Sequence, residues 1–161
     1  MSGAHRAEGE PPLARDVAFM RRCLEEATMA FEVGEVPVGA LVVRDGEVLG
    51  AAGNASVRSH DPTAHAEILA LRAAARTAGN YRLPAAELFV TVEPCLMCVG
   101  AVLQARLDRV VFACRDPKGG ALGSIADYSN DLRLNHRFRV SAGVCEREAR
   151  ELLQRFFRQR R

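Results

Sequence analysis

Three residues of this chain have the side chains and the spacing needed to hold a metal ion. Cys95 and Cys98 are three residues apart in the run PCLMC, and His65 precedes them in the chain. Two thiols with this spacing at the start of a helix lie on one face and can reach a single ion. The positive end of the helix dipole lowers the pKa of such thiols and favours the thiolate that a metal binds. The pattern predicts a metal site made of His65, Cys95 and Cys98.

The count of ligands favours a metal site with an open position. Structural zinc takes four protein ligands, whereas catalytic zinc takes three and leaves one position for water. Outside residues 14–32, the other histidines and cysteines form no second chelating pair: His5, His60, Cys114, His136 and Cys145. A closed structural site and a redox-active cysteine pair are the alternatives, and the redox pair would leave His65 without a role.

Glu67 is the candidate for proton transfer beside an open metal site. Zinc activates a bound water at neutral pH, and a neighbouring carboxylate can carry the proton of that water to a departing nitrogen. The alternative is an ordinary glutamate at a helix N-terminus, where the helix dipole favours it. Because residues two apart in a regular helix point about 200° away from each other, His65 and Glu67 must both reach across the mouth of the helix.

The elements that must position these residues alternate between helices and strands. Apolar periodicity and breaking residues predict helices over about 14–32, 64–79 and 94–106 and from about 145 onward. Asp45-Gly46 predicts a hairpin within residues 37–52, and apolar runs predict strands at 87–92, 109–114 and 137–142. The order αββαβαβ, a glycine-rich loop over 115–131, and a final βα indicates an α/β fold with parallel crossovers.

Composition is that of one globular domain. A length of 161 residues, 48% hydrophobic and 26% charged, excludes a wholly disordered or fibrous chain. We expect residues 14–161 to form that domain and residues 1–13 to be a disordered tail. No apolar run is long enough for a spanning helix and the start lacks a secretory h-region, so we expect a cytoplasmic protein without membrane contact. Five cysteines, an odd number, argue against a disulfide framework.

The basic charge is concentrated at the C-terminus. The formal net charge is only +2, but residues 137–161 carry eight arginines against three glutamates. Such a cluster can be a solvated surface, or it can contact phosphates. In the run RFFR over 155–158, arginines flank two phenylalanines, a combination suited to single-stranded RNA. Neighbours on a helix point about 100° apart, so one phenylalanine can pack inward while the other faces outward, or both can belong to the core.

Together the motifs resemble those of the zinc-dependent nucleobase deaminases, whose signature is H-x-E followed by P-C-x-x-C. A closer resemblance is to the bacterial tRNA adenosine deaminases, and it spans about residues 14–160. It is carried by EVPVGA at 35–40, HDPTAHAE at 60–67, NYRL at 80–83, EPC at 93–95, RD at 115–116 and NHR at 135–137.

This resemblance implies a fold, a cofactor and an activity. The fold would be a three-layer α/β/α cytidine-deaminase-like fold with a central mixed five-stranded sheet. Each subunit of a homodimer would hold one Zn²⁺, and the reaction would convert the wobble adenosine, position 34 of a tRNA anticodon, to inosine. The partner would be the anticodon stem-loop of a tRNA, with an arginine tRNA as the expected substrate. Glu67 would move protons to N1 and to the leaving amine.

The resemblance also implies substrate contacts. Asn54 would orient the base, the Ala66 N–H would bind the oxygen added to the ring, and Val36 and Pro37 would form an apolar wall. The expected contacts with the remaining RNA are Asp116, Lys118, Phe156, Phe157 and Arg158. Asn54 and Asp116 are also ordinary turn residues. Cys114 stands where the family commonly has a small residue, and we expect it to be a buried small hydrophobe.

Two other functions remain open at this point. One is a deaminase that acts on a free base or nucleoside of the guanine or cytidine type, and the basic, aromatic C-terminus weighs against it. The other is a non-catalytic, zinc-stabilised RNA-binding partner subunit, and the intact Glu67 weighs against that.

Overall fold

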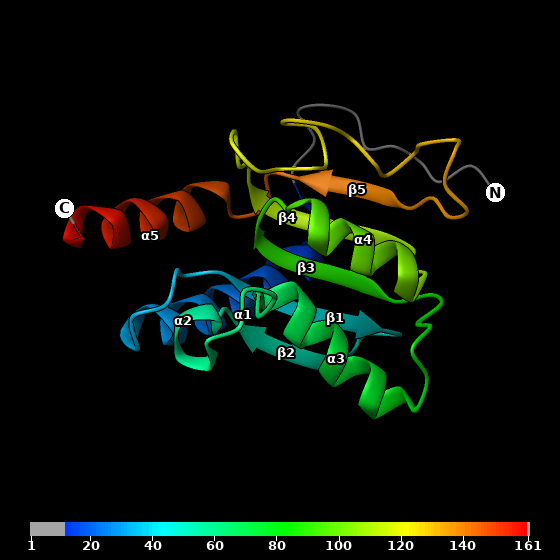
Figure 1. Ribbon diagram of the computed structural model, residues 1–161, viewed down its shortest axis with the longest axis horizontal. Coiled ribbons are helices and arrows are strands. Elements are labelled where there is room, and N and C mark those ends of the chain that lie inside the picture. The colour runs from blue at the N-terminus through cyan, green and yellow to red at the C-terminus, as the bar shows by residue number, and fades with distance from the viewer. Residues whose placement is uncertain (1–11, 161) are drawn as a thin grey trace.

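A five-stranded mixed sheet forms the middle layer of the protein (Figure 1). The computed structural model describes residues 12–160. The sheet order is β2-β1-β3-β4-β5, made by strands β1 (Gly39–Arg44), β2 (Glu47–Gly53), β3 (Glu87–Val92), β4 (Arg109–Cys114) and β5 (Arg139–Ala142). Strand β1 is antiparallel to β2 and β3, whereas β3, β4 and β5 are parallel. The predicted mixed five-stranded sheet is confirmed.

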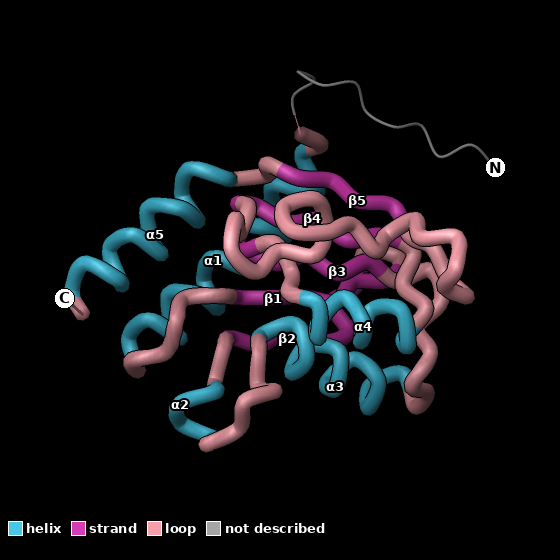
Figure 2. The backbone as a smooth tube through the Cα atoms, turned by 45° about the horizontal axis from the view of Figure 1, so that its top comes forward, coloured by secondary structure: helices cyan, strands magenta, loops and turns pink. Residues whose placement is uncertain are grey.

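Helices cover both faces of this sheet. Alternate strand residues belong to two separate apolar clusters, as the period of two in a strand requires. Helices α3 (Ala66–Ala78) and α4 (Leu96–Ala105) pack on the cluster that contains Val42, Leu88 and Phe112. Helices α1 (Ala14–Glu32) and α5 (Glu146–Gln159) pack on the other face, and Figure 2 shows α3 and α4 together on one side of the strands with α5 on the other. The three-layer α/β/α architecture is therefore confirmed.

Two glycines let helices lie directly on the β1–β2 hairpin. A Cβ at Gly39 would lie 1.9 Å from the carbonyl oxygen of Cys23 in α1, and one at Gly50 would lie 2.4 Å from that of Ala70 in α3. No larger side chain fits between these backbones. The close packing of α3 on β2 fixes the helix whose N-terminus follows His65.

The boundaries differ from the predicted ones in a few places. Helix α4 begins at Leu96 rather than at 94, because Cys95 is extended with φ −75° and ψ 173°. A one-turn helix, α2 (Ser56–Ser59), lies between the predicted hairpin and the predicted helix over 64–79, where no helix was expected. The tail predicted for 1–13 falls, up to residue 11, outside the described residues. Among residues 12–160, no helix has the length and apolar character needed to cross a membrane.

Candidate metal centre and substrate pocket

His65, Cys95 and Cys98 converge in space although thirty residues separate the histidine from the first cysteine. The Nδ1 atom of His65 lies 3.6 Å from Cys95 Sγ and 3.5 Å from Cys98 Sγ. The three donor atoms all lie within 4.8 Å of one another, as the ligands of a single ion must. One imidazole nitrogen and two sulfurs are a donor set that zinc prefers. The predicted ligand cluster is therefore assembled by the fold.

Two helix N-termini meet at this cluster. His65 is the N-cap residue of α3, and Cys95 is the N-cap residue of α4. Cys98 lies one turn into α4, so its sulfur falls on the same side as that of Cys95. The unpaired N–H groups and dipoles of both helix ends favour negative charge between them. Thiolates that bind a metal would be stabilised at this position.

The position of His65 explains how it and Glu67 serve one site. His65 has an extended backbone, with φ −71° and ψ 151°, and α3 starts only at Ala66. The two side chains are therefore not related by helical geometry, and the 200° separation does not apply. Both residues line the same cavity.

The surroundings of the site shift the pKa values of its ionisable groups in different directions, that of Cys95 downward and those of Cys98 and Glu67 upward. A hydrogen bond with the Cys98 thiol, and a second one with the His65 ring, lower the pKa of Cys95 to about 4, although burial acts in the opposite direction. The pKa of Cys98 is raised by its hydrogen bond with the Cys95 sulfur and by burial. Burial is also the main cause that raises the pKa of Glu67, which is only 4% exposed. A carboxylate with a raised pKa takes up a proton more readily than an ordinary one, as a group that transfers protons must.

A cavity of about 290 Å³ opens beside the metal ligands. Its lining contains four of the predicted substrate or proton-transfer residues: Val36, Asn54, Glu67 and Asp116. The rest of the apolar wall is supplied by Val38, Val57 and Val92, which sequence reasoning missed. Pro37 is buried and is absent from the lining, so its predicted place in the wall is taken by the neighbouring valines. The volume is at the low end of the range for ligand sites and suits a single nucleobase.

Two buried carboxylates outside the predicted set hold the edges of this cavity. Glu35 accepts hydrogen bonds from the backbone N–H groups of Val57, at 3.2 Å, and Arg58, at 2.7 Å, and so fixes α2 beside Asn54. Glu93 plays the corresponding part for the segment that begins at Asp116. In the sequence both glutamates are only parts of longer motifs. The sequence pattern that could have indicated their role is a glutamate among apolar residues, directly before a proline or a valine-proline pair.

The C-terminal residues predicted to contact RNA are divided between the core and the surface. Phe156 is 5% exposed and packs edge-on against Phe31, with ring centroids 5.6 Å apart. Phe157 is 50% exposed, and Arg158 is exposed as well. In this conformation only Phe157 of the pair is available at the surface. Lys118 is exposed on the segment after Asp116, and none of these residues lines the cavity.

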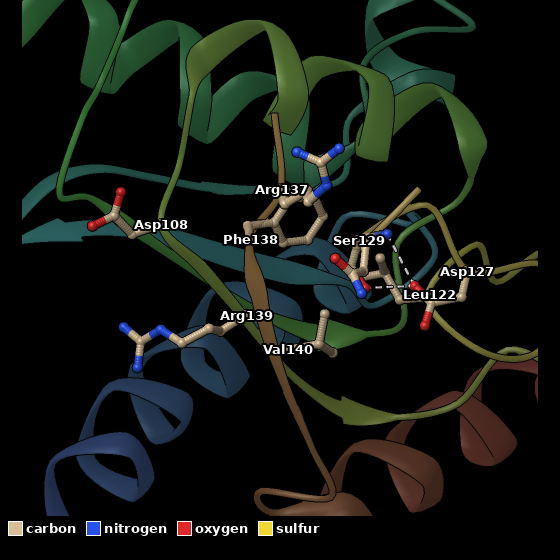
Figure 3. Close-up of a pocket in the computed structure, with 9 residues that line it drawn as sticks. Asp108, Leu122, Asp127, Ser129, Arg137, Phe138, Arg139 and Val140 are labelled. Carbon is tan, nitrogen blue, oxygen red and sulfur yellow. Dashed lines mark hydrogen bonds between the residues drawn. The ribbon is translucent and has the colours of Figure 1, made fainter. Parts of the chain in front are cut away.

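A larger cavity, of about 560 Å³, lies along β5 (Figure 3). Its lining includes Asp108, Asp127, Ser129 and Arg137, and the Ser129 hydroxyl donates to the Asp127 carboxylate at 2.6 Å. No histidine or cysteine is among the nine lining residues. Because His65, Cys95 and Glu67 line the smaller cavity together, the smaller one is the candidate active site.

The other thiols play no part in the metal cluster. Cys114 is buried in the apolar cluster shared with α1 and α5, and its sulfur lies 3.4 Å from the Thr91 carbonyl oxygen. Burial raises the pKa of Cys114 to about 11. The expectation of a buried small hydrophobe is confirmed, and all five cysteines are free of disulfide bonds.

Comparison with known proteins agrees with this site. Residues 15–161 match the MafB19-like deaminase family. The tRNA-specific adenosine deaminase of Haemophilus influenzae is 46% identical over 91% of this chain and 85% of its own length. That of Bacillus subtilis is 41% identical over 92% of both chains.

Solved structures give the same result. A structure from a study of A-to-I editing by tRNA:A34 deaminases superimposes with a TM-score of 0.82, at 43% identity, over 84% of this chain and 99% of the other. A guanine deaminase from Nitrosomonas europaea superimposes with a TM-score of 0.78 at 28% identity, over 92% of this chain and 88% of the other. The chain shares the fold of both structures, but its sequence is more similar to the tRNA deaminases, at 41–46% identity, than to the guanine deaminase, at 28%. This chain therefore belongs to the family of tRNA-specific adenosine deaminases.

Proposed function

We propose that this protein hydrolyses the wobble adenosine, position 34 of a tRNA anticodon, to inosine with release of ammonia. One observation carries the proposal: the buried carboxylate of Glu67 faces the same small cavity as a cluster of one histidine and two cysteines. That arrangement supplies a hydrolytic site at a cavity of the size of one base. The relatives named tRNA-specific adenosine deaminase support the choice of substrate.

The residues present fit a zinc ion. His65 Nδ1, Cys95 Sγ and Cys98 Sγ are three donors at mutually compatible distances, and the fold offers no closing fourth ligand among the described residues that line the cavity. A site with three protein ligands is the catalytic type. When bound, zinc supplies the activation of a water molecule as the nucleophile.

The chain's own residues then divide the remaining work. Glu67, held in a buried position with a raised pKa, relays two protons. It takes the first from the attacking water and passes it to N1 of the adenine, and it takes the second from the hydroxyl added at C6 and passes it to the leaving amine, so that ammonia departs. Asn54 offers an amide to orient the base edge, and the Ala66 N–H at the start of α3 is a donor for the oxygen added at C6. Val36, Val38 and Val57 exclude water from the faces of the flipped base.

Substrate choice between RNA and a free base depends on surfaces outside the cavity. An anticodon loop needs positive charge and an aromatic surface around the pocket, whereas a free base needs only the pocket. Exposed Phe157 and Arg158 on α5 and exposed Lys118 supply such aromatic and positive surface outside the cavity, and Asp116 lines the cavity close to Lys118 in the chain. We expect the flanking nucleotides of the anticodon to lie on them, and an arginine tRNA to be the substrate in the cell.

A homodimer is part of the proposal. Helix α4 exposes apolar surface: Leu96 is 61% exposed, and a Cβ at Gly100 would meet no atom within 4 Å. A second copy packed on this face would lie beside Cys95, the N-cap of the same helix. Gly100→Arg should yield a monomer in sedimentation analysis with its fold intact, and Met29→Arg, at an exposed position of α1 on the other face of the sheet, should leave the dimer unchanged. A cytoplasmic location also remains a prediction.

The test of the reaction replaces Glu67. Glu67→Gln should keep one zinc per chain and bind an anticodon stem-loop as tightly as the wild type, while inosine formation falls by at least about a hundredfold. Glu47→Gln, at an exposed strand end, is the matched control and should remain fully active. Wild-type activity on free guanine or nucleosides, with none on the stem-loop, would instead favour the nucleobase deaminases. Full activity of Glu67→Gln would refute its role.

A further inference from the structure

Glu93 is a buried carboxylate that the proposed chemistry does not use. It lies between the end of β3 and the turn Pro94-Cys95 that starts α4, and its residue is only 3% exposed. A buried charge without partners costs several kcal/mol, so its hydrogen bonds must be accounted for.

All the short hydrogen bonds to this carboxylate come from one segment, residues 116–124. Oε1 accepts from the Asp116 N–H at 3.2 Å and from the Ser124 hydroxyl. Oε2 accepts from the N–H groups of Leu122 and Ser124, both at 3.1 Å. These four hydrogen bonds hold in place a segment that forms few backbone hydrogen bonds of its own.

The backbone beside Glu93 binds the same segment. Ala121 N–H donates to the Pro94 carbonyl at 2.9 Å, and Gly120 pairs with Cys95 as an isolated β-bridge. Asp116 in turn accepts from the N–H groups of Lys118, at 3.1 Å, and Gly119, at 3.2 Å. The metal-binding turn and the edge that carries Asp116 and Lys118 are therefore one connected unit, centred on Glu93.

Gly120 shows how closely this unit is packed. A Cβ there would lie 2.2 Å from both Cδ and Oε2 of Glu93. Gly120 is not among the residues with positive φ. The glycine is thus required by the room that the carboxylate takes, and not by backbone conformation.

We propose that Glu93 is a positioning residue that sets the edge of the pocket, residues 116–124, at the place where Asp116 and Lys118 meet the RNA. This inference rests on the proposed function and names a determinant of its RNA affinity. The carboxylate acts through the segment it holds, because none of its four hydrogen bonds goes to a metal ligand or to Glu67. Loss of the four hydrogen bonds of Glu93 should weaken RNA binding more than it slows the chemical step.

The first experiment is Glu93→Gln in the zinc-loaded protein. An amide oxygen replaces only one acceptor, and its NH₂ group would face N–H donors. We expect KM for the anticodon stem-loop to rise roughly tenfold while kcat changes by less than about threefold, the pattern of lost binding. Glu93→Asp, which keeps the charge but is shorter, should recover part of the affinity.

The control separates positioning from simple stability. Asp16 is also a buried carboxylate, but its partner Arg109 is at the opposite end of β4 from Cys114, about 17 Å away along the strand. Asp16→Asn should lower the melting temperature and leave KM unchanged. If Glu93→Gln behaves in the same way, or leaves both KM and stability unchanged, the positioning role is overturned.

If Glu93→Gln is insoluble, Gly120→Ala alone tests the proposal, because it leaves the carboxylate and its hydrogen-bond donors in the protein. Gly120→Ala pushes on the carboxylate from the far side, so alone it should raise KM by a similar factor. In a Glu93→Ala background the obstructing carboxylate is gone, and Gly120→Ala should add less than about a twofold change. Equal effects of Gly120→Ala in both backgrounds would contradict the coupling.

Hydrogen exchange distinguishes failure of this inference from failure of the proposed function. The Leu122 and Ser124 amides should exchange slowly in the wild type and faster in Glu93→Gln, with the exchange of α3 unchanged. This holds whether or not the protein deaminates tRNA. Unchanged exchange at these amides would overturn the inference even for an active enzyme.

Discussion

Arg160, near the end of α5, donates a hydrogen bond from Nη2 to the carbonyl oxygen of Gly34 at 2.7 Å. Its guanidinium also lies over the ring of Phe156, 4.3 Å from the centroid. Gly34 is two residues before Val36 in the pocket wall. The basic helix at the C-terminus is therefore joined to the turn that leads into the pocket.

Replacing Arg160 tests this connection. Arg160→Ala removes a hydrogen bond and a cation–π contact at a partly exposed position, so it should lower the free energy of unfolding by about 1 kcal/mol. Urea denaturation measures it. Arg158→Ala, another exposed arginine of the same helix, should change stability by less than about 0.5 kcal/mol. Equal stability of the two variants would argue against the contact.

The two phenylalanines of α5 should respond in opposite ways. Phe157→Ala should lower the free energy of unfolding by only about 1 kcal/mol, because half of the residue is exposed and its main aromatic contact is the edge-on one with Phe156. If a base stacks on it, RNA affinity should fall by about 1–3 kcal/mol, a factor of roughly 5 to 150. Phe156→Ala, at the matched buried position, should cost about 3–5 kcal/mol of stability. Anisotropy titration with a stem-loop and urea denaturation separate the two effects, and unaltered affinity of Phe157→Ala would exclude it from the RNA surface.

Local sequence rules could place the metal ligands because motif and element coincide there. The strands at 87–92 and 109–114 have the predicted bounds, since continuous apolar runs buried on both faces carry their own signal. The extended backbone at His65 could not be predicted by helical geometry, which holds only once the helix has begun.

Other features depend on contacts between distant residues. Helix α2 is one turn long, and its N–H groups are held by Glu35, more than twenty residues upstream. Val57 lines the cavity through that contact and has no motif of its own. The segment at 116–124 likewise takes its shape from Glu93. Contacts of this kind, between a carboxylate and backbone N–H groups more than twenty residues away, leave no local pattern in a sequence.

Arg109 should be a major contributor to stability. Its guanidinium is nearly buried and bonds Asp16 at 3.0 and 2.6 Å, Glu87 at 2.8 Å, and the Ser141 hydroxyl. It thereby ties α1 to β3, β4 and β5. Arg109→Met leaves the fully buried Asp16 carboxylate without its main partner, which should cost about 3–5 kcal/mol.

Chemical denaturation of Arg109→Met measures this cost, and exposed Arg139→Met is the control with a change below about 0.5 kcal/mol. Zinc content and KM of the remaining folded protein should equal those of the wild type, because the network lies at the far end of the sheet from Cys95. A cost under 1 kcal/mol would show that the network adds little.

Removal of the metal should expose one reactive thiol. With a pKa of about 4 the Cys95 sulfur is a thiolate at pH 6, whereas a thiol of ordinary pKa near 9 is about 0.1% ionised there. Raised pKa values keep Cys23, Cys114 and Cys145 protonated at that pH. The sign is therefore fixed: lowering the pH from 8 to 6 should slow every thiol except Cys95.

At pH 6 the chelated protein should react quickly with one equivalent of dithiodipyridine, with loss of one thiopyridone. Mass spectrometry should then find Cys95 as the mixed disulfide or, after the Cys98 sulfur displaces the second thiopyridone, in a disulfide with Cys98. Zinc-loaded protein should not react on the same timescale, since the metal occupies the sulfur. Cys95→Ser should lose the fast phase, and Cys145→Ser, at the other half-buried cysteine, should keep it. A fast phase that survives in chelated Cys95→Ser would place the low-pKa thiol elsewhere and contradict the assignment of Cys95.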